Sequence, residues 1–410
     1  MTHAGRGICA LLVSPLVVTL AACPASHETA CVAGDACVVA GTGEAGDGGD
    51  GGPAHLAELW FPTDVTVGPD GRLYVVDWNN NRVRVIREDG TIAIAVGSGA
   101  LGEVRAGAAS VTDMNHPTEV VFDRDGRMLI ATWFNSVVAR VDLARDTLEV
   151  VAGNGERAYH GDGGRALDAA FDRPVSLAFD GGGALLVADQ SNHVIRRIDG
   201  SGVIRTVAGT CTTATCAPGE AAIDCADSDK QSCASDPEGC NRPCEGGHAG
   251  DGGPAAAARF HFPWGAVSEP GGRIAAGRDA EIYVADTHNH RVRRIDADGI
   301  VTTVAGTGRR GTDGDDGRAT DASLEQPTDV AVGPDGTLFI ADSEAGCVRA
   351  VGLDGRIRTV VGRCGERGVS PDHAPARETL LDRPHGIDVA PDGTLFVADT
   401  ANHRVLRIEP

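Results

Sequence analysis

A strand-and-turn unit of about 55 residues recurs six times between residues 37 and 410, and this repeat constrains the fold more than any other feature. Its clearest marker is an apolar four-residue strand that ends in aspartate. The five intact copies are Tyr74–Asp77, Leu186–Asp189, Tyr283–Asp286, Phe339–Asp342 and Phe396–Asp399, and Leu129–Thr132 is a degraded sixth copy. Four short strands in a unit of this length are typical of one blade of a β-propeller.

A proline fifteen residues before the end of each marker opens the innermost strand of its unit. These prolines are Pro62, Pro117, Pro174, Pro327 and Pro384, and Pro263 is displaced by a local insertion. Tight turns such as Pro69-Asp70-Gly71 separate the strands, as hairpins prefer. The repeat therefore predicts an all-β fold of four-stranded antiparallel blades.

The two ends of the repeat predict how the ring closes. The sixth unit ends at Arg404–Ile408 and lacks a fourth strand, and Cys37–Gly41 resembles the missing strand. A strand supplied from the opposite end would remove an exposed sheet edge. We expect a six-bladed propeller over residues 37–410, with three-plus-one closure by the N-terminal strand.

Two insertions fall in the fourth unit. A cysteine-rich stretch over residues 212–246 precedes blade four, and the first hairpin of that blade grows by eight residues around Glu269–Ala280. Binding specificity is usually carried by loops on a rigid scaffold. These insertions are therefore the expected place for a partner to bind.

The N-terminus predicts export. Ile8–Leu20 is a thirteen-residue apolar stretch, too short to span a bilayer comfortably but suited to a signal peptide. The run Leu20-Ala21-Ala22-Cys23 resembles a bacterial lipobox, which predicts a signal peptide over 1–22 and lipidation of Cys23. The alternative is an ordinary secretory peptide in which Cys23 is incidental.

The predicted lipid would be the only membrane attachment of the chain, through a tether over residues 23–36. Pro24 follows the cysteine, and by resemblance to sorting rules in Gram-negative bacteria it favours the outer membrane, on its periplasmic or surface face. We expect a protein anchored in the cell envelope.

The cysteines agree with an oxidising compartment. Without Cys9 and Cys23, ten remain. Antiparallel neighbours place the start of one strand beside the end of the next, which predicts a Cys347–Cys364 disulfide, and we expect Cys31 to pair with Cys37. The other candidates, whose pairing stays open, are Cys211, Cys216, Cys225, Cys233, Cys240 and Cys244. A metal site in this group is less favoured, because no Cys-x-x-Cys pair occurs.

The net charge of -22 argues against a nucleic-acid partner, because such binding depends on lysine and arginine replacing counterions. No basic stripe offsets the acidic balance.

A turn motif, Asp-x-x-Asn-His-Arg-Val, occurs in full at Asp286–Val292 and Asp399–Val405, with variants at Asp189–Val194 and Asp77–Val83. It resembles the NHL repeat, and the resemblance covers about nine-tenths of the chain. Because these side chains recur around the ring, we expect them to bond turn backbone rather than to form one catalytic set. No catalytic residue is assigned.

The family resemblance also implies an alternative function. Peptidyl-hydroxyglycine lyases and lactonase-type propellers resemble this chain in fold and use a metal in the channel. No three histidines stand at equivalent inner positions: His116 stands before its proline, as Arg173, Gln326 and Phe262 do, whereas His385 stands after Pro384. A metal-dependent channel enzyme therefore remains the second hypothesis.

Residues two positions after each inner-strand proline should lie near one mouth of the channel: Asp64, Glu119, Ser176, Gly265, Asp329 and Gly386. Three of them are carboxylates, and His385, His116 and Trp264 are adjacent. They could hold a cation or a polar ligand, or they could cap turns and bind only water.

The Gly-rich connectors offer Asp50, Asp162, Asp251 and Asp315 as candidate Ca²⁺ ligands, although no spacing resembles an EF-hand loop. No other cofactor is expected. From the sequence we predict a binding scaffold whose loops capture a protein, peptide or glycan.

Overall fold

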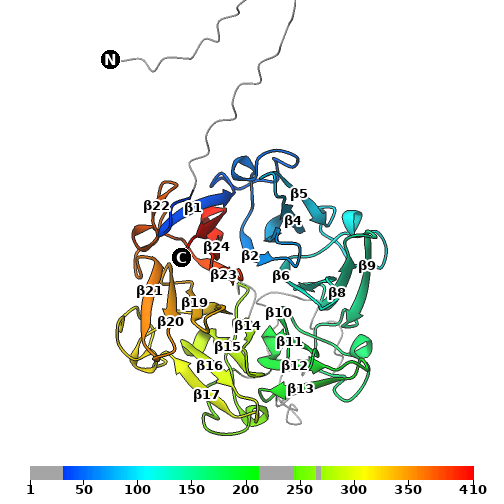
Figure 1. The fold of residues 1–410 in the computed structure, drawn as a ribbon. Helices are drawn as coiled ribbons and strands as arrows, with labels where there is room; N and C mark the ends of the chain where they lie inside the picture. The colour runs from blue at the N-terminus through cyan, green and yellow to red at the C-terminus, as the bar shows by residue number, and fades with distance from the viewer. Residues whose placement is uncertain (1–30, 212–243, 245, 265–268) are drawn as a thin grey trace, which may run out of the picture. The chain divides into compact units, whose positions relative to one another are not determined.

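The computed structural model describes residues 31–211, 244, 246–264 and 269–410. These residues form six antiparallel sheets around a central axis (Figure 1). Each sheet is one blade, and its strands follow one another from the axis to the rim. The six-bladed propeller predicted from the repeat is confirmed.

The strands are numbered along the chain. Blade one consists of β2 (Pro62–Val67), β3 (Leu73–Asp77), β4 (Arg82–Ile86) and β5 (Ile92–Val96), and blade two of β6 (Pro117–Phe122), β7 (Met128–Thr132), β8 (Val137–Asp142) and β9 (Thr147–Ala152). Blade three consists of β10 (Pro174–Phe179), β11 (Leu185–Asp189), β12 (Val194–Ile198) and β13 (Ile204–Ala208), and blade four of β14 (Ile274–Ala276), β15 (Ile282–Asp286), β16 (Arg291–Ile295) and β17 (Val301–Ala305). Blade five consists of β18 (Pro327–Val332), β19 (Leu338–Asp342), β20 (Cys347–Val351) and β21 (Ile357–Gly362). Blade six consists of β23 (Pro384–Val389), β24 (Leu395–Asp399), β25 (Arg404–Ile408) and β1 (Asp35–Ala40), with β22 (Ala374–Pro375) at its outer edge.

One-turn 3-10 helices punctuate the connections. Those that lead into the inner strands of blades one to six are η1 (Ala54–Leu56), η3 (Ala109–Val111), η4 (Ala166–Asp168), η6 (Ala255–Ala257), η8 (Ala319–Asp321) and η9 (Ala376–Glu378). Those that join the second strand to the third are η2 (Trp78–Asn80), η5 (Gln190–Asn192), η7 (Thr287–Asn289) and η10 (Thr400–Asn402). None of the helices in the described part of the chain is long and apolar enough to span a bilayer.

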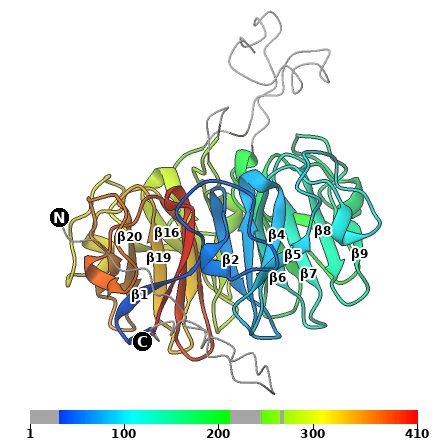
Figure 2. The same cartoon turned by 90° about the horizontal axis from the view of Figure 1, so that it is seen from above.

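The hydrophobic core is divided into six clusters, one at each interface between neighbouring blades. The middle strands β3 and β4 are buried at nearly every position because both faces of their sheet pack on other blades. The outer strands are buried at both ends and more exposed in the middle, as in β5. Figure 2 shows the ring from its edge, with neighbouring blades side by side.

The ring closes through β1, which pairs antiparallel with β25: Ala36 stands opposite Ile408, and Val38 opposite Leu406. This confirms the predicted three-plus-one closure. The strand begins at Asp35, two residues before the predicted start, because Asp35 and Ala36 also pair with β22.

Three disulfides brace the described residues. Cys31–Cys37 and Cys347–Cys364 confirm the two predicted pairs, and Cys211–Cys244 resolves one pairing that the sequence left open. The other predicted cysteines, Cys216, Cys225, Cys233 and Cys240, lie outside the described residues, as does Cys23.

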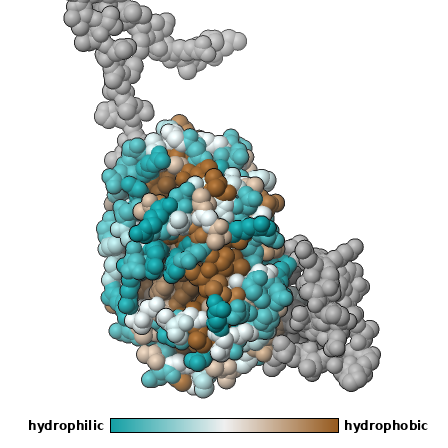
Figure 3. All heavy atoms as spheres, turned by 90° about the vertical axis from the view of Figure 1, so that its right-hand side faces the viewer, coloured by the Kyte–Doolittle hydropathy of each residue, from teal (hydrophilic) through white to brown (hydrophobic). Residues whose placement is uncertain are grey.

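Figure 3 views the rim on the side of β9 and shows apolar residues gathered between hydrophilic bands. Large apolar side chains are exposed in the connector between blades one and two, including Leu101 and Val111. This connector lies in the half of the ring that holds blades one to three, whereas the pocket described below is formed by blades four to six.

Candidate ligand-binding site at the channel mouth

The starts of the inner strands and the turns after the second strands lie on one face of the ring. In each blade the inner strand runs away from this face and the second strand returns to it, because the two pair antiparallel. Side chains around Pro62, Pro327 and Pro384 therefore meet those around Asp77, Asp342 and Asp399. This face carries the mouth of the channel.

Below the mouth, a buried arginine occupies the axis. The Nη1 atom of Arg273 lies 2.9 Å from Asp64, 3.7 Å from Glu119 and 3.8 Å from Asp329. Its Nη2 atom donates hydrogen bonds to the carbonyl oxygens of Thr63 and Thr118, at 2.8 and 2.6 Å. The guanidinium is fully buried and the three carboxylates nearly so. These carboxylates thus surround a cation that the chain itself supplies.

Arg273, and not Gly265 as predicted from Pro263, occupies the inner-strand position of blade four; Gly265 itself lies outside the described residues. Arg273 precedes β14 and accepts the backbone N–H of Ala285, so it is the blade-four counterpart of Ser176 beside Ala188 in blade three. Trp264, Glu269 and Pro270, described residues between Pro263 and β14, line the pocket at the mouth. The first hairpin turns tightly at Gly277–Glu281, where Gly277 donates to Glu281, and is not enlarged as predicted.

The same carboxylates join neighbouring blades through their backbone bonds. Asp64 accepts the N–H of Val120 at 3.1 Å, and Asp329 accepts that of Ile387 at 2.9 Å. Glu119 accepts the N–H of Leu177 in the same manner. Each bond runs from one inner strand to the inner strand of the next blade. Asp64, Glu119, Asp329 and Arg273, called the bolt below, therefore tie the inner strands together at the axis.

Burial dominates the electrostatics of this bolt. It raises the pKa of Glu119 well above its ordinary value, although the positive charge of Arg273 opposes this shift. Burial likewise raises the pKa of Asp329 to about 7 against the same opposing charge. The pKa of Arg273 is raised: burial disfavours its charge, but the attraction of Asp64, Asp329 and Glu119 outweighs that penalty.

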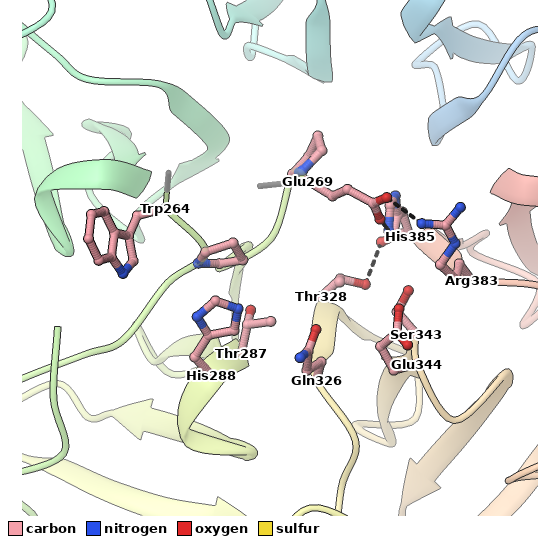
Figure 4. Close-up of a pocket in the computed structure, with 12 residues that line it drawn as sticks. Trp264, Glu269, Thr287, His288, Gln326, Thr328, Ser343, Glu344, Arg383 and His385 are labelled. Atoms are coloured by element: carbon pink, nitrogen blue, oxygen red, sulfur yellow. Dashed lines mark hydrogen bonds and ion pairs between the residues drawn. The ribbon is translucent and has the colours of Figure 1, made fainter. Parts of the chain in front are cut away.

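Above the bolt, a pocket of about 330 Å³ opens among blades four, five and six (Figure 4). Its lining includes two of the predicted mouth residues, Trp264 and His385. The other lining residues are Pro263, Glu269, Pro270, Thr287, His288, Gln326, Thr328, Ser343, Glu344 and Arg383. The volume lies in the range of small-molecule sites.

An ion-paired group forms one wall of the pocket. Glu269 contacts Nε2 of His385 at 3.1 Å and accepts a bond from Nη1 of Arg383. Burial opposes ionisation of Glu269, but the bond to His385 and the charges of His385 and Arg383 outweigh it and lower the pKa of the glutamate. Arg383 also lies over the ring of Phe61.

Two buried polar atoms of the lining have no hydrogen-bond partner among the described residues: Nδ1 of His385 and Oγ of Ser343. Both side chains are almost fully buried, so these atoms reach no bulk solvent. At the rim, Trp264 is 52% exposed. The pocket thus combines unused buried hydrogen-bonding groups with an accessible aromatic ring.

The third predicted mouth residue of this group, His116, does not line the pocket. Its ring packs against Trp78 at 4.6 Å and Phe134 at 5.2 Å between centroids, in an aromatic cluster of blades one and two. Burial lowers its pKa to about 4. The mouth is therefore divided into an aromatic half and a half with a polar pocket.

The repeated turn motif has a structural role, as the sequence predicted. In blade one, Asp77 accepts the N–H of Trp60 at 2.8 Å and a bond from the Asn80 amide, which also donates to the carbonyl of Gly46. Blades three, four and six repeat these bonds around Asp189, Asp286 and Asp399.

The histidine of the motif fastens one blade to the next. Nδ1 of His193 accepts the N–H of Phe262, and Nδ1 of His403 accepts the N–H of Phe61, both at 3.1 Å. In blade one the residue is Asn81, whose Oδ1 accepts the N–H of His116 at 3.0 Å. A histidine can accept this bond only while Nδ1 is unprotonated.

We predict that His193→Asn will remove an acid-dependent loss of stability. Burial, with the nearby ring of His261, lowers the pKa of His193 to about 3, whereas an unfolded histidine titrates near pH 6.5. Below about pH 6.5 the unfolded state binds more protons than the folded state, so the stability of the wild type decreases as the pH is lowered. Asparagine keeps the acceptor and does not titrate. Between pH 7.5 and 5, the stability difference should shift by about 2 kcal/mol in favour of the variant.

Urea unfolding of both proteins at the two pH values measures this shift. His193→Ala is the control, since it removes the titration and the bond together and should be less stable than His193→Asn at both pH values. An unchanged difference between wild type and His193→Asn would contradict the assignment.

The connector aspartates proposed as Ca²⁺ ligands pair with buried arginines. Arg84 donates to Asp50 at 2.9 Å, and its counterparts pair in the same way: Arg196 with Asp162, Arg293 with Asp251, and Arg349 with Asp315. Each guanidinium also donates to backbone carbonyls, as Arg84 does to Glu58 and Gly48. These aspartates therefore hold the connectors to the blades, and Ca²⁺ binding by them stays a prediction.

A group with the composition of a metal site lies at the closure: Cys37, Asp372 and His373. The sulfur of Cys37 is already bonded to Cys31, so it offers no thiolate in this state.

Four site residues were not predicted from the sequence: Arg273, Glu269, Ser343 and Arg383. Arg273 had a detectable signal, since it stands thirteen positions before Asp286, as Asp64, Glu119 and Asp329 do before the ends of their own markers. Counting back from the marker, rather than forward from Pro263, avoids the insertion. The other three had no comparable signal.

Comparisons with known proteins agree with this architecture. The NHL repeat family matches residues 59–86, 324–350 and 381–408, and the teneurin NHL domain matches residues 120–231. Teneurin-m of Drosophila melanogaster is 27% identical over 381 residues, which cover 86% of this chain and 12% of that protein. The chain thus spans only a small part of the curated relatives it matches.

Solved structures share the fold at low identity. A protein of unknown function from Bacteroides thetaiotaomicron superposes with a TM-score of 0.61 at 15% identity, covering 91% of this chain and 75% of that one. An auxiliary nutrient binding protein from Bacteroides ovatus gives a TM-score of 0.60 at 14% identity, covering 92% and 76%. The chain is thus a six-bladed β-propeller that contains NHL repeats.

Proposed function

We propose that this propeller is a binding scaffold that captures a protein, peptide or glycan on the face that carries the channel mouth. The observation that carries the proposal is the pocket of about 330 Å³, lined by side chains from three blades and edged by the exposed ring of Trp264. The ring beneath it is fixed by the Arg273 bolt and by blade-to-blade bonds. A rigid support of this kind lowers the entropic cost of binding.

The scaffold would work outside the cytoplasm. Three disulfides among the described residues support an oxidising compartment. The lipobox-like run that ends at Cys23 supports anchoring by a lipid in the bacterial cell envelope, most simply the outer membrane. One structural relative is described as an auxiliary nutrient binding protein, which fits a binding role.

A screen on two libraries tests the scaffold function. We expect the purified protein to select ligands from a random peptide library or a glycan array, and Trp264→Ala to abolish or strongly weaken the selected binding. Trp60→Ala is the matched control, because Trp60 is 46% exposed and does not line the pocket. Selected ligands that bind both variants like wild type, or the absence of any selected ligand, would refute a binding role for this face.

A further inference from the structure

The proton positions in the pocket wall define what it presents to a ligand. An ionised carboxylate only accepts hydrogen bonds, so Nε2 of His385 must carry the hydrogen that faces Glu269, 3.1 Å away. The other ring nitrogen, Nδ1, has no partner in the described structure; it accepts a hydrogen bond when the ring is neutral and donates one when the ring is protonated. His385 is only 2% exposed, so this buried atom can be satisfied in either state by a ligand hydroxyl, which both donates and accepts.

The hydroxyl groups of Thr328 and Ser343 belong to the same part of the lining as His385. Thr328 donates its hydrogen to the carbonyl oxygen of His385 at 3.1 Å, which leaves its lone pairs as acceptors. Ser343, whose buried Oγ has no partner among the described residues, can both donate and accept. Figure 4 shows Thr328, Ser343 and His385 on the same side of the pocket. A buried polar group left unpaired costs about 1–3 kcal/mol, so a ligand that satisfies these atoms gains by binding there.

The two carboxylates of the lining are already paired with cations. Glu269 is paired with Arg383, and Glu344 is paired with Arg367 at 3.3 Å. Burial lowers the pKa of His288 to about 4, so this ring is neutral at pH 7. An anionic ligand would find no unpaired cation among the described lining residues, and a cationic ligand would have to displace an arginine. The pocket therefore favours a neutral ligand.

Trp264 supplies the remaining element. Its large ring, half exposed at the rim, offers an apolar face with a polar edge. A molecule that presents C–H groups on one side and hydroxyls around its edge matches both this ring and the unpartnered buried atoms of His385 and Ser343. We propose that the mouth pocket binds a neutral, hydroxyl-rich ring, that is, a neutral saccharide unit. The proposal rests on the scaffold function and names its ligand class.

Titration calorimetry with the mature protein tests the ligand class. The probes are glucose, galactose, mannose, N-acetylglucosamine and their disaccharides, against glucuronic acid and glucose 6-phosphate. At least one neutral probe should bind with a Kd below about 1 mM, and the charged analogues should bind at least about tenfold more weakly. Trp264→Ala should weaken binding about tenfold, and Ser343→Ala about fivefold.

Each variant has a matched control outside the pocket. Trp60→Ala removes a similarly exposed ring, and Ser191→Ala removes a buried hydroxyl that likewise lacks a partner in the described structure. Neither should change saccharide affinity. Ser343→Ala breaks no side-chain hydrogen bond within the described part of the chain, so it should leave the fold intact and report on binding alone.

Two results would overturn the saccharide assignment: no neutral probe binds, or binding is insensitive to both pocket substitutions. The peptide library separates this failure from that of the scaffold function. If selected peptides bind in a Trp264-dependent manner while saccharides do not, the ligand class is wrong and the scaffold stands. If neither class binds through the mouth, both proposals fall.

Discussion

Replacing Arg273 with methionine is expected to destabilise the ring by about 3–5 kcal/mol at pH 7.5, the cost of removing one partner from a buried ionic group. Methionine fills much of the same volume but leaves Asp64, Glu119 and Asp329 buried without a cation. It also removes two donors to the carbonyl oxygens of blades one and two. Chemical unfolding monitored by tryptophan fluorescence measures the loss.

The pH dependence distinguishes this electrostatic effect from a packing defect. Without the guanidinium, the pKa values of Glu119 and Asp329, already raised by burial, rise further above those of the unfolded chain. The folded variant then binds more protons than its unfolded state, so its stability falls as pH rises. The deficit of Arg273→Met should therefore shrink between pH 8 and pH 5.

A variant that also carries Asp64→Asn and Asp329→Asn is the control for this experiment, because it removes two of the stranded charges. It should recover a large part of the loss at pH 7.5. If the deficit is independent of pH and the added substitutions restore nothing, Arg273 does not act as the cation of the bolt.

The repeat allowed the ring to be predicted because each blade carries its own local markers. The apolar strand ending in aspartate, the inner proline and the Asp-Gly turns are set by neighbours in the chain, and they fix strand order and spacing. The closure by β1 followed from the same logic, since Cys37–Gly41 copies the outer strand of other units. Local patterns thus determined the architecture.

The functional face was less accessible to sequence reasoning, because its contacts are not local. Glu269 meets His385 and Arg383 across more than a hundred residues, and Arg273 meets Asp64 across more than two hundred. An insertion in blade four shifted the register that would have aligned Arg273 with the carboxylates. His385 and Trp264 could be predicted, since their positions follow directly from the inner-strand prolines.

The motif residues show a further limit of the same kind. That Asp77 and Asn80 bond nearby backbone could be predicted from their side chains, which favour turns. That His193 and His403 reach the following blade could not, because the acceptor geometry depends on their left-handed backbone, at φ of 53° and 52°. The turn directs the imidazole toward a backbone N–H group of the following blade, which is in place only once the propeller has closed.

The second large effect concerns closure, and Gly41→Ala is expected to destabilise the protein by about 2–5 kcal/mol. Gly41 has φ of +93°, and a Cβ atom there would lie 2.3 Å from the carbonyl oxygen of His403 and 2.7 Å from Cα of Arg404. The left-handed conformation costs an alanine about 1–2 kcal/mol. Overlap with backbone adds about 1–3 kcal/mol, since β1 or β25 must move.

Gly43→Ala separates these two contributions. Gly43 has a similar φ of +88°, but its added Cβ would meet only the carbonyl oxygen of Asn402, at 3.8 Å. This control should lose about 1–2 kcal/mol, the conformational cost alone. The Cys31–Cys37 disulfide lies wholly within the N-terminal segment and cannot hold a displaced β1 on β25. Gly41→Ala should therefore also release the segment to limited proteolysis and expose the β25 edge, which favours association of the protein on size-exclusion chromatography. Equal stability of the two variants would mean that β1 does not seat on β25 as the ring requires.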